Sequence, residues 1–166
     1  MRLRADTCRL PDGRILSPYY VLEYSDWVHV VAITPAQEVV LIQQYRHGRQ
    51  EVILEIPGGV MDKNEKSALA AAKRELLEET GYASDEFLFL GTVDPNPASH
   101  TNTNHLFLAT NARPVAAQNL DENEDIEVVL TPLDEILDLL RQGVFRQTLN
   151  VSALFFALDR LGYVGA

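Results

Sequence analysis

The stretch "PGGVMDKNEKSALAAAKRELLEETGY", residues 57–82, places three glutamates within five residues at the end of a helix-forming segment. An α-helix turns by about 100° per residue, so Glu75, Glu78 and Glu79 project from one side of a single turn. Like charges at these spacings destabilise an isolated helix, and negative charge near its C-terminus opposes the helix dipole. The pattern indicates either a solvated acidic face with basic neighbours or a site for a divalent cation such as Mg²⁺, which prefers oxygen ligands.

The chain as a whole limits the classes of function. Its 166 residues, of which 46% are hydrophobic, suit one domain over residues 1–166 with a substantial core. A net charge of −10 argues against nucleic-acid and anionic membrane partners, but it permits a phosphate-bearing small molecule when metal ions lie between. The single Cys8, the lack of a signal-peptide pattern and the lack of a long apolar run predict a soluble, cytoplasmic protein.

Hydrophobic patterning predicts an α/β or α+β fold. Runs rich in Val, Ile, Leu and Phe predict strands at 27–34, 38–46, 51–56, 87–93, 105–112 and 124–132. Helical spacing and terminal glycines predict helices at 67–80, 133–142 and 148–161, the first burying Ala68, Leu69, Ala72 and Leu76. Because strands and helices do not alternate regularly, we expect a mixed sheet with helices packed on its faces.

Residues 58–82 resemble the Nudix box, the signature of the Nudix hydrolases. That signature reads Gly, five residues, Glu, seven residues, Arg-Glu, an aliphatic residue, any residue, Glu-Glu, any residue, Gly and an aliphatic residue. "RELLEETGY" (74–82) matches the second half, with Tyr82 where an aliphatic residue is usual. Gly59 and Glu65, separated by five residues, match the first half.

The box departs from the signature at one point. Eight residues, not seven, separate Glu65 from Arg74, so counting back from the arginine places Lys66 at the expected Glu position. We expect loop 60–66 to absorb the extra residue and the helix to be regular from about Ser67. In the family the first Glu braces the loop near the box arginine, and the sequence leaves open whether Glu65 does so here.

The resemblance implies a metal-dependent reaction. In the family, the helix glutamates, here Glu75, Glu78 and Glu79, hold Mg²⁺ or Mn²⁺ together with a backbone carbonyl of the Gly-Gly turn, here Gly58. The substrates are nucleoside diphosphates linked to another group. Water attacks one phosphorus atom while the metals stabilise the developing charge.

Two outer segments resemble the ADP-ribose and ADP-sugar pyrophosphatase branch of this family. They are "LPDGR…YYVLEYSDWVHVVAIT…VVLIQQYRHG…LEIPGG" and "NLDENEDIEVVLTPLDEILDLLRQGVF". In that branch an acidic loop supplies a glutamate that handles the attacking water, which implies Glu124 first and Glu122 second as the base. The alternative is a flexible acidic surface loop. The polar loop 94–105 departs from the branch, and we expect it to set specificity for the linked group.

Three further residues are candidates for substrate binding. Arg46 resembles an arginine that contacts substrate or phosphate, with a surface ion pair to Glu51 or a neighbouring residue as the alternative. Glu55 is a candidate for supporting the site, or belongs to an ordinary hydrogen-bond network within its strand. Trp27 is a candidate for stacking on a base, and otherwise packs in the core or an interface.

The function predicted is Mg²⁺-dependent hydrolysis of the pyrophosphate bond in ADP-ribose or a nucleoside diphosphate sugar. The alternatives are hydrolysis of a dinucleoside polyphosphate or an oxidised nucleotide, and a non-catalytic nucleotide sensor. A homodimer is expected, because the branch often exchanges N-terminal strands across a two-fold axis. Here the apolar residues Ile15, Tyr19, Tyr20 and Val21 would supply the contact.

Overall fold

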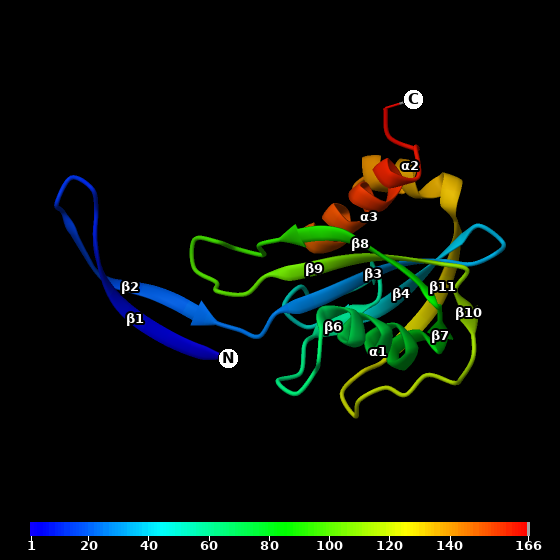
Figure 1. The fold of residues 1–166 in the computed structure, drawn as a ribbon, viewed down its shortest axis with the longest axis horizontal. Helices are drawn as coiled ribbons and strands as arrows, with labels where there is room; N and C mark the ends of the chain where they lie inside the picture. Colours follow the sequence, from blue (N-terminus) through cyan, green and yellow to red (C-terminus); the bar gives the residue numbers. More distant parts are fainter. Residues whose placement is uncertain (166) are drawn as a thin grey trace.

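A seven-stranded mixed sheet forms the centre of the protein in a computed structural model that describes residues 1–165 (Figure 1). Its strands are β3 (Trp27–Ile33), β4 (Glu38–Arg46), β5 (Glu51–Glu55), β6 (Gly58–Val60), β8 (Glu86–Val93), β9 (Asn104–Thr110) and β11 (Ile126–Pro132). The main order is β11-β4-β3-β9-β8, with β5 paired to β4 and β6 to β3. The β3–β9 pair is parallel and the other pairs are antiparallel. A small second sheet joins β7 (Tyr82–Ala83) to β10 (Arg113–Pro114).

Strand β3 is buried on both faces because helices cover both sides of the sheet. Val28 and Val30 pack in one core cluster with residues of α1 (Ala68–Thr80). Val31 and Ile33 point the other way, into a cluster with residues of α3 (Thr148–Arg160) and α2 (Ile136–Arg141). This explains the near-continuous apolar run of β3, since alternate side chains of a strand face opposite sides. None of the helices within residues 1–165 is long and apolar enough to cross a membrane.

Helix α1 carries the clustered glutamates and is regular throughout. The Ser67 side chain caps its first turn by accepting a hydrogen bond from the Ala70 amide, 3.2 Å away. It ends at Gly81, whose φ of 74° suits glycine. The extra residue of the box is therefore accommodated before the helix, as predicted. The prediction that Leu69 is buried was wrong, because Leu69 is 39% exposed and Ala68 makes the contact with the core instead.

The remaining differences from the predicted elements lie at turns. The predicted strand 51–56 ends at Glu55, and the chain then enters β6, which was not predicted because glycines disfavour strands. The predicted helix 133–142 begins with a 3₁₀ turn at Leu133–Glu135 and continues as α2. The other predicted strands and the helix at 148–161 agree with the structure to within two residues at each end.

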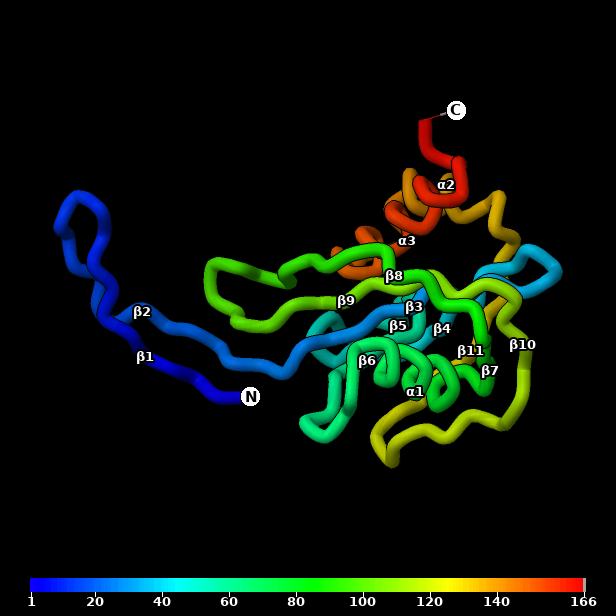
Figure 2. The backbone as a smooth tube through the Cα atoms, viewed as in Figure 1, coloured from blue at the N-terminus to red at the C-terminus, as the bar shows by residue number. Residues whose placement is uncertain are grey.

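The N-terminal residues form a hairpin that stands apart from the central sheet (Figure 2). Strands β1 (Arg2–Arg9) and β2 (Ile15–Glu23) pair only with each other and are joined by the turn at 10–14. The base of the hairpin is tied to loop 94–103 by hydrogen bonds that link Leu22 to Ser99 and Thr101. The hairpin is therefore a projecting arm with few contacts to the rest of its own chain.

Candidate active site

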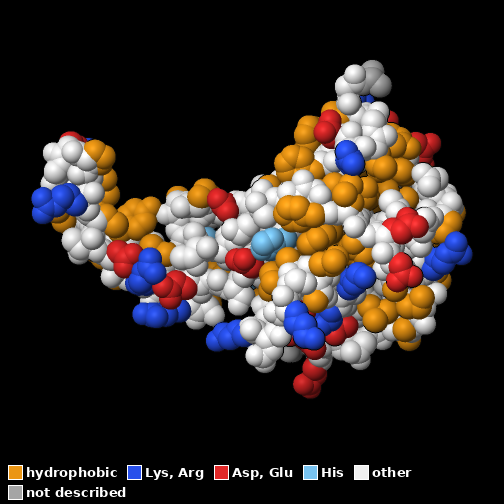
Figure 3. All heavy atoms as spheres, viewed as in Figure 1, with side chains coloured by type: hydrophobic (Ala, Val, Ile, Leu, Met, Phe, Trp, Pro, Cys, Tyr) orange, Lys and Arg blue, Asp and Glu red, His pale blue; other side chains and the backbone are white. Residues whose placement is uncertain are grey.

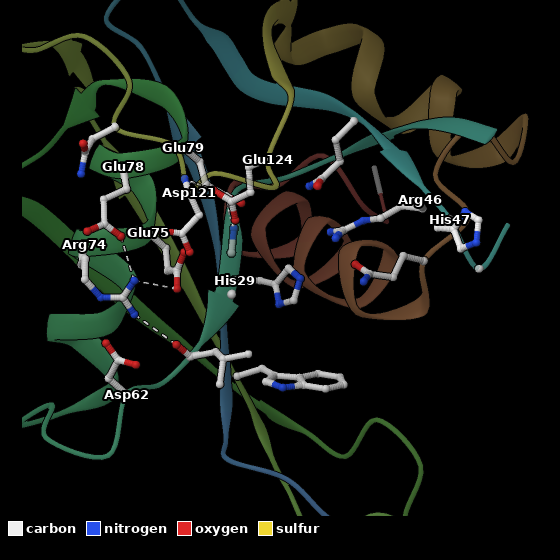
Figure 4. Close-up of a pocket in the computed structure, with 18 of the residues that line it drawn as sticks. His29, Arg46, His47, Asp62, Arg74, Glu75, Glu78, Glu79, Asp121 and Glu124 are labelled. Atoms are coloured by element: carbon white, nitrogen blue, oxygen red, sulfur yellow. Dashed lines mark hydrogen bonds and ion pairs between the residues drawn. The ribbon is translucent and has the colours of Figure 1, made fainter. Parts of the chain in front are cut away.

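A hollow of about 770 Å³ brings most of the predicted site residues together (Figure 4). It lies between α1, the β5–β6 turn, the end of β4 and the loop before β11. The predicted residues in its wall are Trp27, Arg46, Gly58, Glu75, Glu78, Glu79 and Glu124. Glu122 and Glu55 are not part of this wall, although Glu55 lines a cavity that adjoins it.

Two of the helix glutamates are removed from water. Glu79 is only 5% exposed, and one of its carboxylate oxygens accepts a hydrogen bond from the Gly58 amide at 2.8 Å. Burial raises the pKa of Glu75 to about 7 and that of Glu79 to about 8. The negative charge of Glu124 is a smaller contributor to the raised pKa of both groups. A site that holds ionised carboxylates in this position needs a nearby positive charge.

Arg74 organises the box by contacting three carboxylates, of which Figure 4 shows those of Glu75 and Glu78. Its Nε donates to Glu65 at 2.8 Å, and its Nη1 lies 2.9 Å from both Glu75 and Glu78. These hydrogen bonds, above all the one to Glu65, raise the pKa of Arg74. Glu65 also accepts a hydrogen bond from the Asp62 amide at 2.7 Å. Glu65 thus braces both the loop and the arginine, which answers the question left open by the longer spacing.

The carboxylate oxygens in this hollow are the type of ligand that a hard divalent cation prefers. Glu75, Glu79 and Glu124 present carboxylates to one hollow, and they repel one another when ionised. Within residues 1–165, no three His, Cys, Asp or Glu side chains converge into a metal cage, because Arg74 and the Gly58 amide already engage the box glutamates. The contact of Gly58 with the glutamates is through its amide, and a ligand role for its carbonyl stays a prediction.

The acidic loop before β11 places one glutamate, Glu124, in the same hollow as the box glutamates. Glu124 accepts a hydrogen bond from the amide of Asp121 at 3.0 Å, which closes a tight turn. Both residues line the hollow, whereas Glu122 does not. The structure therefore places Glu124, the first choice from the sequence, near the helix glutamates.

The opposite wall is formed around Arg46. Its Nε donates to Glu55 at 2.8 Å, and the Glu55 side chain is only 2% exposed. The alternative predicted for Arg46 was a surface ion pair with Glu51 or a neighbouring residue, and the ion pair observed is with the buried Glu55 instead of Glu51. Trp27 lines the hollow and also makes an edge contact with Tyr24, with ring centroids 5.8 Å apart.

Several residues in the wall were not predicted as part of the site. They are His29, Gln44, Asn119, Asp121 and Gln147. His29 is buried, and its Nδ1 lies 2.9 Å from the Asn104 side-chain oxygen. Burial lowers the pKa of His29, which favours the neutral ring. Asn119 and Asp121 belong to the acidic segment that resembles the branch. No local motif singles out His29, Gln44 and Gln147 as site residues, because these three come from separate elements that only the folded chain brings together.

Comparison with known families agrees with this geometry. Residues 24–150 match the model of the NUDIX domain. Residues 1–22, the arm, match the nucleoside diphosphate sugar hydrolase N-terminal domain. The chain belongs to the Nudix family and is a Nudix hydrolase, which confirms the fold class predicted from the sequence.

Known relatives indicate which kind of Nudix hydrolase the chain resembles. The chain is 30% identical to the ADP-ribose pyrophosphatase of Bacillus subtilis, with the match covering 83% of this chain and 74% of that protein. It is 32% identical to the ADP compounds hydrolase NudE of Escherichia coli, over 74% of this chain and 65% of that protein. A crystal structure of an ADP compounds hydrolase superposes with a TM-score of 0.84 at 28% identity, covering 98% and 88% of the two chains. These findings define a hydrolase of the pyrophosphate bond in a nucleoside diphosphate linked to another group.

Proposed function

We propose that the protein hydrolyses ADP-ribose or a nucleoside diphosphate sugar to a nucleoside monophosphate and a sugar phosphate. The observation that carries this proposal is the pair of carboxylates, partly buried Glu75 and buried Glu79, that share one hollow with Glu124 and the Gly58–Gly59 turn. Relatives named ADP-ribose pyrophosphatase and GDP-mannose pyrophosphatase support this substrate class.

Divalent metal ions are the general cofactors of Nudix pyrophosphatases, and we propose Mg²⁺ or Mn²⁺ here. Glu75, Glu78, Glu79 and the Gly58 carbonyl would hold the metal. When bound, the metal supplies a Lewis acid beside the phosphates and lowers the pKa of water. Arg74 holds Glu65, Glu75 and Glu78 in the arrangement from which they would bind it.

The remaining roles belong to the chain itself. Glu124 takes the proton of the attacking water, because it lines the hollow from outside helix α1 and makes no ion pair among the described residues. Arg46, held by Glu55, donates to a phosphate oxygen from the opposite wall. Trp27, which also lines the hollow, offers an aromatic face to the base.

A broader range of ADP-linked substrates is the second candidate. It is favoured by the resemblance to NudE, whose name describes it as acting on ADP compounds. A dinucleoside polyphosphate would then be cleaved at the same site. A purely sensory role fits less well, since the three helix carboxylates of the box, Glu75, Glu78 and Glu79, are all present and line one hollow.

A second copy of this chain is the proposed partner. The arm carries exposed apolar side chains, among them Leu3 at 61%, Ile15 at 52% and Tyr20 at 58% exposure. Hydrophobic side chains are visible along it (Figure 3). A two-stranded hairpin is marginally stable alone, so packing against a partner would stabilise it.

A substrate panel tests the proposed reaction. ADP-ribose, ADP-glucose, GDP-mannose and diadenosine triphosphate are incubated with Mg²⁺ or Mn²⁺, and the products are separated by chromatography. ADP-ribose or a nucleotide sugar is expected to give a nucleoside monophosphate plus a sugar phosphate, and chelation of metal is expected to stop the reaction. If none of the four compounds is cleaved with either metal, the proposal is wrong.

A further inference from the structure

A second cavity of about 470 Å³ adjoins the catalytic hollow and shares part of its wall. It is lined by Arg46, Arg49, Ile53, Glu55, Arg146, Gln147 and Thr148. The three arginines come from the end of β4, the β4–β5 turn and the segment before α3. In a chain with a net charge of −10, three guanidinium groups around one cavity make a local exception to the acidic surface.

The charges of this cavity are only partly neutralised. Arg49 and Arg146 both pair with the same carboxylate, Glu51, at 3.9 and 2.7 Å. Arg46 pairs with Glu55 through its Nε alone. Three guanidinium groups thus face two carboxylates, and Arg49 and Arg146 stay about half exposed. Their remaining N–H groups have no other ion pair among residues 1–165, so they are available to an anion.

The N-terminus of α3 adds to the positive electrostatic potential in this cavity. Its N-cap residue, Gln147, makes no side-chain capping hydrogen bond, and its first turn contains no acidic residue. The N–H groups at a helix N-terminus favour negative charge. Since Gln147 and Thr148 both line the cavity, this helix end and the arginines act on the same space.

One buried carboxylate oxygen in the wall of this cavity lacks a hydrogen-bond donor within residues 1–165. The Oε1 atom of Glu55 is buried and has no hydrogen-bond partner among the described residues. Buried polar atoms are normally paired, and a carboxylate oxygen is satisfied only by a donor. A hydroxyl group of a sugar is such a donor, whereas a bare phosphate ion at neutral pH offers poorer complementarity beside this carboxylate.

We propose that this cavity binds the group linked to the nucleoside diphosphate, and that it prefers a sugar carrying its own phosphate or carboxylate. The sugar hydroxyls reach Glu55, and the anionic substituent reaches Arg49, Arg146 and the start of α3. The inference rests on the proposed function, because it assigns the two ends of that substrate. The nucleoside takes the side of Trp27, which lines the catalytic hollow but not this cavity.

A matched pair of substrates tests the preference. ADP-ribose is compared with ADP-ribose that carries a phosphate on its terminal ribose, and kcat/KM is measured for each with Mg²⁺. We expect the phosphorylated compound to be preferred about tenfold, the size of one partly exposed charge-assisted contact. The preference should shrink as salt is raised. ADP-ribose phosphorylated on its adenosine ribose should gain no advantage, and a preference for that compound over the other overturns the assignment.

Two variants that should change the kcat/KM ratio in opposite directions distinguish a role in binding the anionic substituent from a role in stability alone. Arg146→Gln should bring the ratio of kcat/KM values toward one, whereas Glu51→Gln, which frees Arg146 and Arg49, should raise the ratio. A merely structural Glu51–Arg146 ion pair would shift both variants in the same direction. Arg141→Gln, which removes an exposed arginine of α2 outside both cavities, is the control and should leave the ratio unchanged.

The outcomes also separate this inference from the proposed function. If wild-type protein cleaves both compounds equally well, or if neither Arg146→Gln nor Glu51→Gln alters the ratio, the inference is wrong and the proposed function stands. If neither compound is cleaved, the proposed function fails. The affinities of the protein for the same two compounds are then measured by calorimetry. Tighter binding of the compound phosphorylated on its terminal ribose supports the inference, and equal affinities overturn it.

Discussion

The carboxylate of Glu75 lies directly against the backbone of Gly59. A Cβ atom placed on residue 59 would lie 2.5 Å from Oε1 of Glu75, a distance that real Cβ contacts do not reach. The glutamate has little freedom to retreat, since its side chain is 12% exposed and paired with Arg74 at 2.9 Å. The second glycine of the turn is therefore required for the close approach of the turn to this carboxylate.

Replacing Gly59 by alanine should displace Glu75. We expect kcat to fall by about tenfold or more, because a carboxylate moved by an ångström no longer binds the metal correctly. The half-saturating Mg²⁺ concentration should rise, which metal titration of activity measures. Gly48→Ala is the control for folding, since a Cβ there meets no atom within 4 Å. A Gly59→Ala protein with unchanged metal dependence would contradict the proposed contact.

The Glu79→Gln variant removes charge while keeping shape. The amide oxygen of glutamine can still accept the hydrogen bond from Gly58, so the fold should survive. Turnover should fall by roughly two orders of magnitude, as expected when a charged group is removed from a reacting centre. Steady-state kinetics and thermal unfolding, measured together, check both parts. Near-wild-type turnover in a folded Glu79→Gln protein would exclude Glu79 as a metal ligand.

The metal-free protein should lose stability as pH rises. Folded Glu75 and Glu79 release their protons at about 7 and about 8, compared with an ordinary pKa of 4.5. Between these values the unfolded chain binds fewer protons than the folded chain, so the free energy of unfolding falls with pH. The lowered pKa of Glu65 acts in the opposite direction, but at and below its ordinary value of 4.5. The lowered pKa of buried His29 also acts in the opposite direction, but at and below its ordinary value of 6.5, so the fall in stability is expected above pH 6.5.

Chemical unfolding in the presence of a chelator, from about pH 6.5 to pH 8, measures this slope without the contribution of His29. Each offset group contributes at most about 1.4 kcal/mol per pH unit. Glu79→Gln should flatten the slope, and added Mg²⁺ should do the same because it stabilises the ionised carboxylates. A wild-type protein whose stability rises with pH over this range would show that the two carboxylates are ionised without cost.

The helical part of the site was predictable because its spacing is local. Once residues 67–80 are recognised as a helix, the spacing of Glu75, Glu78 and Glu79 fixes their common side. The loop before the helix was less certain, yet the extra residue could be assigned there because the helical pattern has no break. The relative positions of side chains in a site can thus be predicted from sequence when a single helix carries all of them.

The wall around Arg46 could not be predicted in the same way. In the β4–β5 register Arg46 lies opposite Glu51, which is the partner that sequence favours. The arginine instead binds Glu55, because a carboxylate buried to 2% exposure needs a donor far more than one that is 45% exposed. Burial depends on α3 and the β5–β6 turn, so the pairing follows only from the assembled fold.

The two glutamates of the acidic loop should differ in their importance. Glu124→Gln should lower kcat by about a hundredfold or more with little change in KM, as expected for a base that acts in the transition state. Glu122→Gln is the matched control and should stay close to wild type, since Glu122 lies outside the hollow. If Glu122→Gln is crippled and Glu124→Gln is not, the base is Glu122.

The arm should hold two copies of the chain together. Leu3 and Tyr20 lie on one face of the hairpin, because Leu3 pairs with Leu22 and Ala5 pairs with Tyr20, and alternate residues share a face. Both are more than half exposed, and burying them against a second copy gains roughly 25 cal/mol per Å² of apolar surface. Light scattering at micromolar concentration should therefore give a dimer, and the Leu3→Ser, Tyr20→Ser double variant should give a monomer. Val115→Ser, which removes an apolar side chain that is 63% exposed elsewhere, should stay dimeric. A wild-type protein that is strictly monomeric in this measurement would rule out the arm as a dimer contact.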